Sequence, residues 1–118
     1  FAGWSEKEGE LFVQAPRELL DRLVAVRLHL DPCQEEDGPL QVVPRSHALG
    51  ILAADASLRT RSELGSRACI AGIGDALVMR PLLLHASSKS SGSGLRRVLH
   101  FLLAPRELPF GLRWRHAV

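Results

Sequence analysis

Alternation of apolar and polar residues predicts the first long strand of the chain at residues 24–31. Its even positions are apolar: Val24, Val26, Leu28 and Leu30. Its odd positions are mostly polar: Ala25, Arg27, His29 and Asp31. Side chains on a strand alternate between its two faces, so this period of two predicts one core face and one polar face. We expect the even positions to face the core.

Two longer apolar runs predict the centre of the fold. Residues 75–85 and 98–103 are almost continuously apolar, and the Ser/Gly-rich segment 87–94 lies between them. Apolar runs bounded by turn residues are typical of buried strands, and a Ser/Gly-rich segment is typical of a solvated loop. We therefore predict an antiparallel hairpin. Such a hairpin brings His85 and Arg96 to the same end of the sheet.

The remaining segments predict shorter elements. These are a short helix at 15–23, a strand at 40–43, a helical or irregular excursion at 51–65 and a strand at 68–73. Several short strands with Gly, Pro and Asp turns predict an all-β, mainly antiparallel sandwich or barrel, with one short helix near the N-terminus. A length of 118 residues suits a single domain, residues 1–118.

Composition narrows the class of partner. The net charge is +2, from 15 basic and 13 acidic residues, and the chain has no tyrosine. Without a basic and aromatic surface we expect no nucleic acid as partner. Charges interrupt the apolar runs and no signal peptide is recognisable, so we expect no membrane partner either. Cys33 and Cys69 form no CxxC motif; they suit reduced thiols in a cytoplasmic protein, with a single disulfide as the alternative.

Three segments resemble the phytanoyl-CoA dioxygenase (PhyH) family of Fe(II)/2-oxoglutarate-dependent oxygenases. They are LHLDPCQEEDGPLQVVPRSH, GDALVMRPLLLHASS and RRVLHF. The resemblance implies a double-stranded β-helix, the cupin-like jelly roll, with Fe(II) and 2-oxoglutarate as cofactors. It also implies that His85 is the distal iron ligand and that Arg96 binds the far carboxylate of 2-oxoglutarate. The family's usual Pro-Gly-Ser-His turn is Pro-Arg-Ser-His at residues 44–47, where Arg45 replaces the glycine.

The family's remaining two iron ligands belong to an HxD motif. By the resemblance, this motif lies upstream of the LHLD strand, in a segment that would precede Phe1. The chain is therefore expected to be the C-terminal part of the domain, an incomplete jelly roll. A local HxD exists at His29-Leu30-Asp31, and its two polar side chains share a strand face. His29 and Asp31 are thus alternative metal ligands, which would form a self-contained triad with His85; chance matches to so short a motif are common.

Each candidate also has a structural interpretation. His85 can be a histidine held by a backbone hydrogen bond, and Arg27 and His29 can line a pocket wall while Asp31 caps the next turn. Arg96 shares its strand face with Val98 and His100, whereas Arg97 shares a more apolar one, so Arg96 is the better carboxylate partner and Arg97 the alternative. Arg80 is either a second substrate-facing charge or a buried arginine with an acidic partner. The other singled-out residues are expected to be structural: His47, Cys33 and Cys69.

Two functions follow from these observations. The first is an Fe(II)/2-oxoglutarate-dependent oxygenase, a hydroxylase of a small organic substrate, in which this chain carries the distal histidine and the 2-oxoglutarate arginine. Iron sites of this class use two histidines and a carboxylate, so whether the chain is itself an enzyme depends on the HxD motif. The second is a non-catalytic jelly-roll remnant that acts as a ligand-binding or dimerisation module. Exposed sheet edges favour a homodimer in that case.

Overall fold

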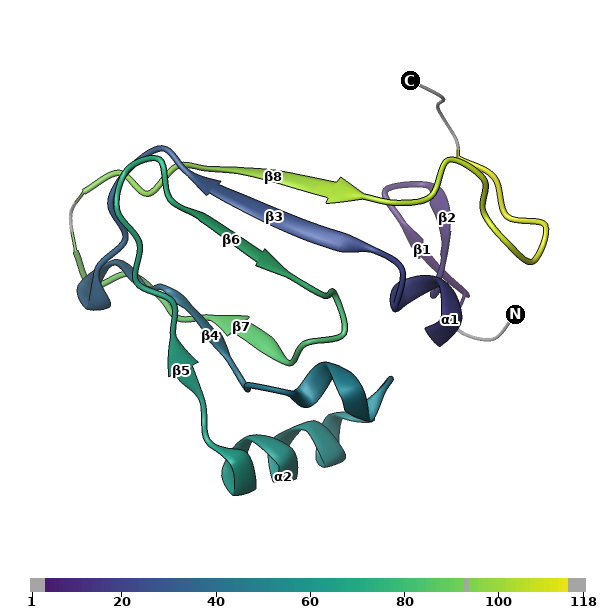
Figure 1. Cartoon of the computed structure of the whole chain (residues 1–118), viewed down its shortest axis with the longest axis horizontal. Coiled ribbons are helices and arrows are strands. Elements are labelled where there is room, and N and C mark those ends of the chain that lie inside the picture. Colours follow the sequence, from purple (N-terminus) through teal and green to yellow (C-terminus); the bar gives the residue numbers. More distant parts are fainter. Residues whose placement is uncertain (1–3, 93, 115–118) are drawn as a thin grey trace.

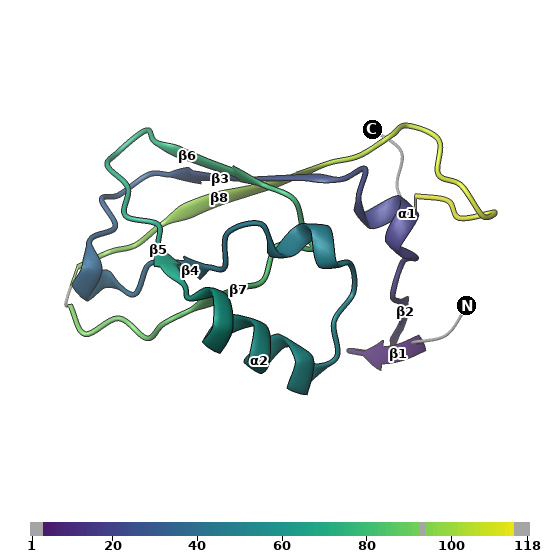
Figure 2. The same cartoon turned by 60° about the horizontal axis from the view of Figure 1, so that its bottom comes forward.

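The computed structural model describes residues 4–92 and 94–114. Two three-stranded antiparallel sheets face each other in it (Figures 1 and 2). The first sheet has the strand order β6 (Ala76–Met79), β3 (Val24–His29) and β8 (Val98–Leu103). The second has the order β5 (Arg67–Ala68), β4 (Leu40–Val42) and β7 (His85–Ser87). A separate hairpin is formed by β1 (Trp4–Lys7) and β2 (Glu10–Val13).

Helices occupy the connections between the strands. The short helix α1 (Arg17–Leu20) follows Pro16 and buries Leu19, as expected for a proline at the start of a helix. The excursion predicted at 51–65 is helical: α2 (Ala54–Leu64) lies on the side of the second sheet that faces away from the first (Figure 2). Two 3-10 turns cover Glu35–Asp37 and Ser46–Leu49. Within the described part of the chain, no helix has the length and apolar character needed to cross a membrane.

The core lies between the two sheets. Ala25 and Met79 of the first sheet pack with Leu40 and Val42 of the second, and these four residues are buried. Burying an aliphatic side chain of this size stabilises a fold by about 1.5–3 kcal/mol. The contact fixes which side of each sheet is the inner one, and it is on the inner side that the candidate site is found.

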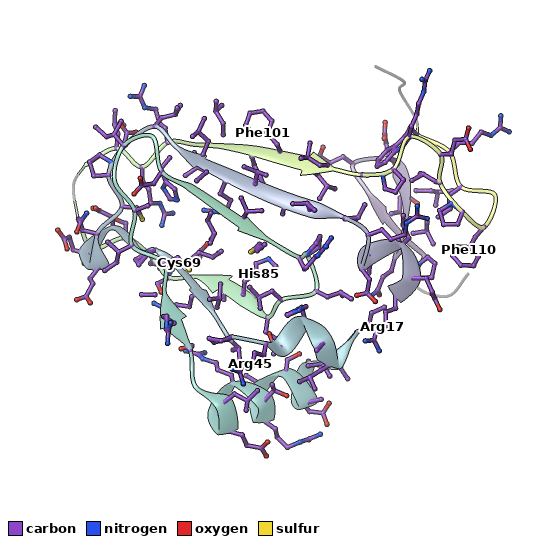
Figure 3. All side chains as sticks on the ribbon, in the orientation of Figure 1. Arg17, Arg45, Cys69, His85, Phe101 and Phe110 are labelled. Atoms are coloured by element: carbon purple, nitrogen blue, oxygen red, sulfur yellow. The ribbon has the colours of Figure 1, made fainter. Side chains whose placement is uncertain are left out.

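The expected orientation of residues 24–31 is wrong. The buried Ala25 and His29 are odd positions, so the odd face of β3 looks toward the second sheet. The even positions lie opposite apolar residues of β8 on the outer face, where Val26 is opposite Phe101. Phe101 is 46% exposed and points away from the second sheet in Figure 3. Alternation shows that a strand has two different faces but not which of them is covered. In this structure the second sheet covers the face that carries Arg27 and His29.

The predicted hairpin between residues 75–85 and 98–103 is also wrong. The first run is divided into β6 in one sheet and β7 in the other, and β8 pairs with β3 instead. The division comes at Arg80-Pro81, where Leu83 N–H donates to the Arg80 carbonyl in a turn. Proline supplies no N–H to a strand ladder, so an apolar run that contains it changes direction there.

The Pro-Arg-Ser-His turn ties the end of β4 to the start of β7. Ser46 is fully buried; its Oγ donates to the Val43 carbonyl at 2.7 Å and accepts from Leu84 N–H at 2.8 Å. Val43 N–H in turn donates to the Leu84 carbonyl at 3.0 Å. Leu84 precedes His85, so this hydrogen-bond network sets the position at which His85 enters its strand.

Arg45 occupies a left-handed backbone conformation, with φ of 69°. A side chain with a Cβ is strained there by about 1–2 kcal/mol, and glycine relieves that strain at some cost in unfolded-chain entropy. We expect Arg45→Gly to raise the free energy of unfolding by about 0.5–1 kcal/mol. Urea unfolding measures the change, with Arg59→Gly in the exposed helix α2 as a control that should destabilise. A loss of stability in Arg45→Gly would contradict the assigned conformation.

Candidate functional site

His85 is the first residue of β7 and lies on the inner side of the second sheet. It pairs with Val42 of β4, which belongs to the core, and directly opposed residues share a face. Figure 3 places its ring between the two sheets. The Nδ1 atom lies 2.6 Å from the Leu83 carbonyl. A carbonyl can only accept, so Nδ1 carries the proton and the lone pair of the neutral ring is on Nε2. The predicted backbone hydrogen bond is therefore present, and it leaves one ring nitrogen able to bind a metal.

Arg96 lies beside the other end of β7. Its Nη1 donates to the Asp37 carbonyl at 2.8 Å and also to the Gly38 carbonyl. Gly38 has a φ of 68°, and a Cβ on it would meet the Ser88 carbonyl oxygen and approach Arg96 Nη1 to 2.9 Å. Gly38 therefore provides the space in which Arg96 reaches the start of β4 and the residue that follows β7. His85 and Arg96 come to opposite ends of this three-residue strand.

Arg97 is engaged elsewhere. Its Nε and Nη2 donate to the two carboxylate oxygens of Asp31 at 2.9 and 3.1 Å, and its backbone N–H donates to Asp31 Oδ2 at 2.8 Å. These hydrogen bonds hold the pKa of the Asp31 carboxyl below its usual value. Arg97, the alternative carboxylate partner, is thus already paired bidentately with a carboxylate of the chain itself, and Asp31 is committed to that pair.

The pairing of Asp31 with Arg97 predicts a pH dependence of stability. Because the folded-state pKa of Asp31 is lowered, its contribution is fully present above the ordinary pKa and is lost as the pH falls through the folded value. We expect Asp31→Asn to flatten the acid limb of a plot of unfolding free energy against pH, measured by urea unfolding. Arg97→Gln should flatten the same limb. Acid limbs parallel to that of the unchanged protein would contradict the assignment.

His29 lies buried on the inner face of β3, with 4% of its surface exposed. Its backbone N–H donates to the Asp75 carbonyl at 2.9 Å and its carbonyl accepts from Gly74 at 2.8 Å. Burial, followed by the charge of Arg27, lowers the pKa of the His29 ring; Arg96 adds to the lowering and Asp75 opposes it. The ring borders a cavity of about 230 Å³ whose wall includes Cys69, Asp75 and Leu77. His29 therefore lines the pocket wall, as one of the sequence interpretations holds.

The remaining predicted residues are structural or peripheral. Arg80 Nη1 donates to the Leu23 carbonyl at 3.1 Å. Cys33 and Cys69 are free thiols, and burial raises the pKa of both, so they stay protonated and unreactive near neutral pH. His47 is exposed in the 3-10 turn 46–49.

Metal-binding side chains do not gather into a complete site in the part of the chain that the structure describes. Among residues 4–92 and 94–114, no group of three His, Cys, Asp or Glu side chains is arranged to hold a metal ion. The self-contained combination of His29, Asp31 and His85 is therefore not assembled there. Of the predicted ligands, His85 has a ring oriented by a hydrogen bond that leaves Nε2 available, whereas His29 lies on the other sheet and Asp31 is paired with Arg97.

Sequence reasoning missed two residues that shape this site. The first is Ser46, which stands in the same motif as His47; a serine two residues after the proline that follows a strand is a signal for a turn-stabilising hydroxyl. The second residue is Gly38. Its proximity to Arg96 depends on a contact between segments 58 residues apart, and no local pattern reports such a contact.

The family model of phytanoyl-CoA dioxygenase (PhyH) matches residues 7–98. The chain belongs to the phytanoyl-CoA dioxygenase family. No curated protein sequence matches the chain. The residues matched by the PhyH model include His47, His85 and Arg96. The match itself assigns no role to any of these residues.

Solved structures share the fold of this PhyH chain. EctD from S. alaskensis with bound Fe has a TM-score of 0.61 and 20% identity, covering 70% of this chain and 31% of its own. AviO1 from Streptomyces viridochromogenes Tue57 has a TM-score of 0.65 and 22% identity, covering 90% and 44%. HygX from Streptomyces hygroscopicus, with nickel and 2-oxoglutarate bound, has a TM-score of 0.60 and 21% identity, covering 95% and 43%. The chain thus spans less than half the length of each.

Proposed function

We propose that the chain is the C-terminal part of a jelly-roll domain of a PhyH oxygenase, in which it supplies the distal iron ligand, His85, and the 2-oxoglutarate anchor, Arg96. The observation that carries this proposal is the hydrogen bond from His85 Nδ1 to the Leu83 carbonyl, which leaves Nε2 for a metal. In metal-binding histidines, a hydrogen bond made by the ring nitrogen that does not bind the metal fixes the tautomer and the orientation of the ring. Two facing antiparallel sheets support the jelly roll, because from β3 to β8 the chain crosses between them at every connection except that from β4 to β5.

The residues present fit one position of an iron site. Facial iron sites of oxygenases take two histidines and a carboxylate and leave the other positions open. Among the described residues, His85 is the predicted ligand whose ring is oriented by a hydrogen bond, and no group of three ligands is assembled there, so the remaining ligands belong outside the set placed here. With 2-oxoglutarate and oxygen, iron held in such a site supplies the oxidising power for hydroxylation of a small organic substrate. EctD with bound Fe and HygX with 2-oxoglutarate bound support these two cofactors.

Arg96 is suited to holding a carboxylate. Its Nη1 is fixed by the carbonyls of Asp37 and Gly38, so the guanidinium plane is oriented before any ligand arrives. The guanidinium has further N–H groups, and a planar fork of this type matches a carboxylate with two parallel hydrogen bonds. Pre-orientation lowers the entropy that binding must remove, which favours affinity for the co-substrate.

A non-catalytic, dimerising module is the second candidate. The outer face of the first sheet exposes Val78, Leu99, Phe101 and Leu103, and β8 lies at the edge of that sheet. Apolar faces and open strand edges favour association with a second copy. Sedimentation equilibrium tests this candidate: a monomer at millimolar concentration would reject the homodimer. A cytoplasmic location stays a prediction from the sequence.

Nuclear magnetic resonance with Ni(II) tests the metal role of His85. Ni(II) is paramagnetic and stable in air, and it accompanies 2-oxoglutarate in the HygX structure. We expect substoichiometric Ni(II) to broaden the resonances of His85 and Ala86 first, because bound paramagnetic metal acts at short range. His85→Ala should remove this broadening, and His47→Ala, which changes an exposed histidine, should preserve it. Broadening centred instead on the exposed carboxylates of Glu35–Asp37 in all three proteins would reject the proposal.

A further inference from the structure

Arg27 and His29 lie next to each other on the inner face of β3. They are two residues apart on one strand, so their side chains leave the same face, the one that Ala25 anchors in the core. Across the sheet, Arg27 is opposite His100 and His29 is opposite Val98. The pair therefore faces the second sheet, in the region of the cavity that His29 borders.

Both side chains carry a buried nitrogen without a partner. Within residues 4–92 and 94–114, Arg27 Nε and His29 Nδ1 are covered from solvent and have no hydrogen-bond partner. The large majority of buried polar atoms in folded proteins do have one, since burial without a hydrogen bond is costly. Two unpaired nitrogens on adjacent positions of one face indicate that something outside the described residues completes their hydrogen bonding.

The charge around the pair favours an anion. Arg27 and Arg96 both lie close enough to the His29 ring for their positive charges to lower its pKa. The negative charge of the Asp75 carboxylate raises the pKa of His29 and so opposes the two arginines. Its Oδ2 already accepts from Gly72 N–H at 2.7 Å. Among the described residues, Arg27 forms no ion pair. A carboxylate would satisfy both unpaired nitrogens and balance the local charge.

We propose that Arg27 and His29 form a carboxylate-binding subsite on the inner face of β3, beside Arg96. Arg27 Nε–H donates to one oxygen, and the His29 ring, in the tautomer with hydrogen on Nδ1, donates to the other. The adjoining cavity of about 230 Å³ suits the end of a small organic acid and not a bulky group. The inference deepens the proposed oxygenase function: the carboxylate belongs either to the organic substrate, which is then an acid, or to 2-oxoglutarate itself.

The test uses the full chain labelled with nitrogen-15 at arginine and histidine, with acetate and 2-oxoglutarate as probes. We expect acetate to shift the resonances of Arg27 Nε and His29 Nδ1, and to leave Arg59 Nε, which is paired with Asp55, unchanged. Arg27→Gln should weaken acetate binding at least tenfold at the His29 resonance. Absence of a shift at both nitrogens with either probe would overturn the subsite, as would a His29 shift of equal affinity in Arg27→Gln.

Arg96→Gln distinguishes the two sources of the carboxylate. For a substrate carboxylate, acetate should still shift Arg27 Nε when 2-oxoglutarate is saturating, and with the same affinity in Arg96→Gln. For a carboxylate of 2-oxoglutarate, saturating 2-oxoglutarate should abolish the acetate response, and Arg96→Gln should weaken the shift that 2-oxoglutarate causes. The broadening of the His85 resonances by Ni(II) is measured in a separate titration, which tests the oxygenase function. Broadening without any shift at Arg27 overturns only the subsite, and a shift without broadening overturns only the oxygenase function.

Discussion

Replacing Ser46 by alanine should lower the free energy of unfolding by about 1–3 kcal/mol. It leaves Leu84 N–H without its partner and removes one of the two hydrogen bonds to the Val43 carbonyl, which keeps the one from Ser46 N–H. Ser46 Oγ donates to the Val43 carbonyl and accepts from Leu84 N–H, and the serine itself has no exposed surface. No water can replace a hydroxyl at a fully covered position unless the turn opens. Since Leu84 precedes His85, the same substitution should also displace His85 from its place at the start of β7.

Urea unfolding measures the first effect and the Ni(II) titration measures the second. Ser62→Ala is the matched control, because Ser62 is exposed in helix α2, where alanine is a slightly better helix former. We expect that control to leave stability unchanged or raise it by a few tenths of a kcal/mol. A Ser46→Ala variant as stable as the control, with unaltered Ni(II) broadening at His85, would show that the turn does not position the histidine.

Replacing Arg96 by glutamine should weaken 2-oxoglutarate binding by about 10- to 100-fold, the equivalent of losing a charged hydrogen-bond pair. Glutamine keeps a polar group near the carbonyls of Asp37 and Gly38 but removes the charge and the planar fork. Calorimetric titration with 2-oxoglutarate measures the change in affinity. The far-ultraviolet circular dichroism of the variant should match that of the unchanged chain.

Arg97→Gln is the control for this prediction. Arg97 is adjacent in sequence and equally charged, but it is bound bidentately by Asp31. Its loss should change the acid dependence of stability and leave the affinity for 2-oxoglutarate within about twofold. Should the two substitutions weaken 2-oxoglutarate binding equally, the assignment of Arg96 as the anchor would be wrong.

Local patterns in the sequence predict the elements well and their pairing poorly. The strand at 98–103 and the strand at 24–29 within the predicted 24–31 follow from apolar patterning and turn residues. The segment 51–65 is predicted only as helical or irregular, and it contains the helix α2. Which sheet a strand joins depends instead on contacts between distant segments. The run 75–85 looks continuous by hydropathy, and it is the turn at Pro81 that sends its two halves to different sheets.

The candidate site shows the same division. His85 and Arg96 are predicted by motif and resemblance, and alternation predicts that Arg96 shares the side of Val98, which is opposite the buried His29. The hydrogen bonds of Arg96 to Asp37 and Gly38 could not be predicted, because they join segments 58 and 59 residues apart. The polar interior of β3 was hidden for a further reason. Hydrophobicity assigns the apolar face to the core, whereas a ligand site turns a polar face inward.

The central claim is that metal and 2-oxoglutarate bind at one place, between His85 and Arg96. An anaerobic calorimetric titration of the complete domain, in which this chain supplies one of the three iron ligands, tests it most directly, with Fe(II) added in the presence and absence of saturating 2-oxoglutarate. Ligands that share a site and bind together change each other's affinity reciprocally. We predict that 2-oxoglutarate strengthens Fe(II) binding about tenfold or more, and that either His85→Ala or Arg96→Gln removes this coupling. Equal Fe(II) affinity with and without 2-oxoglutarate would contradict the account.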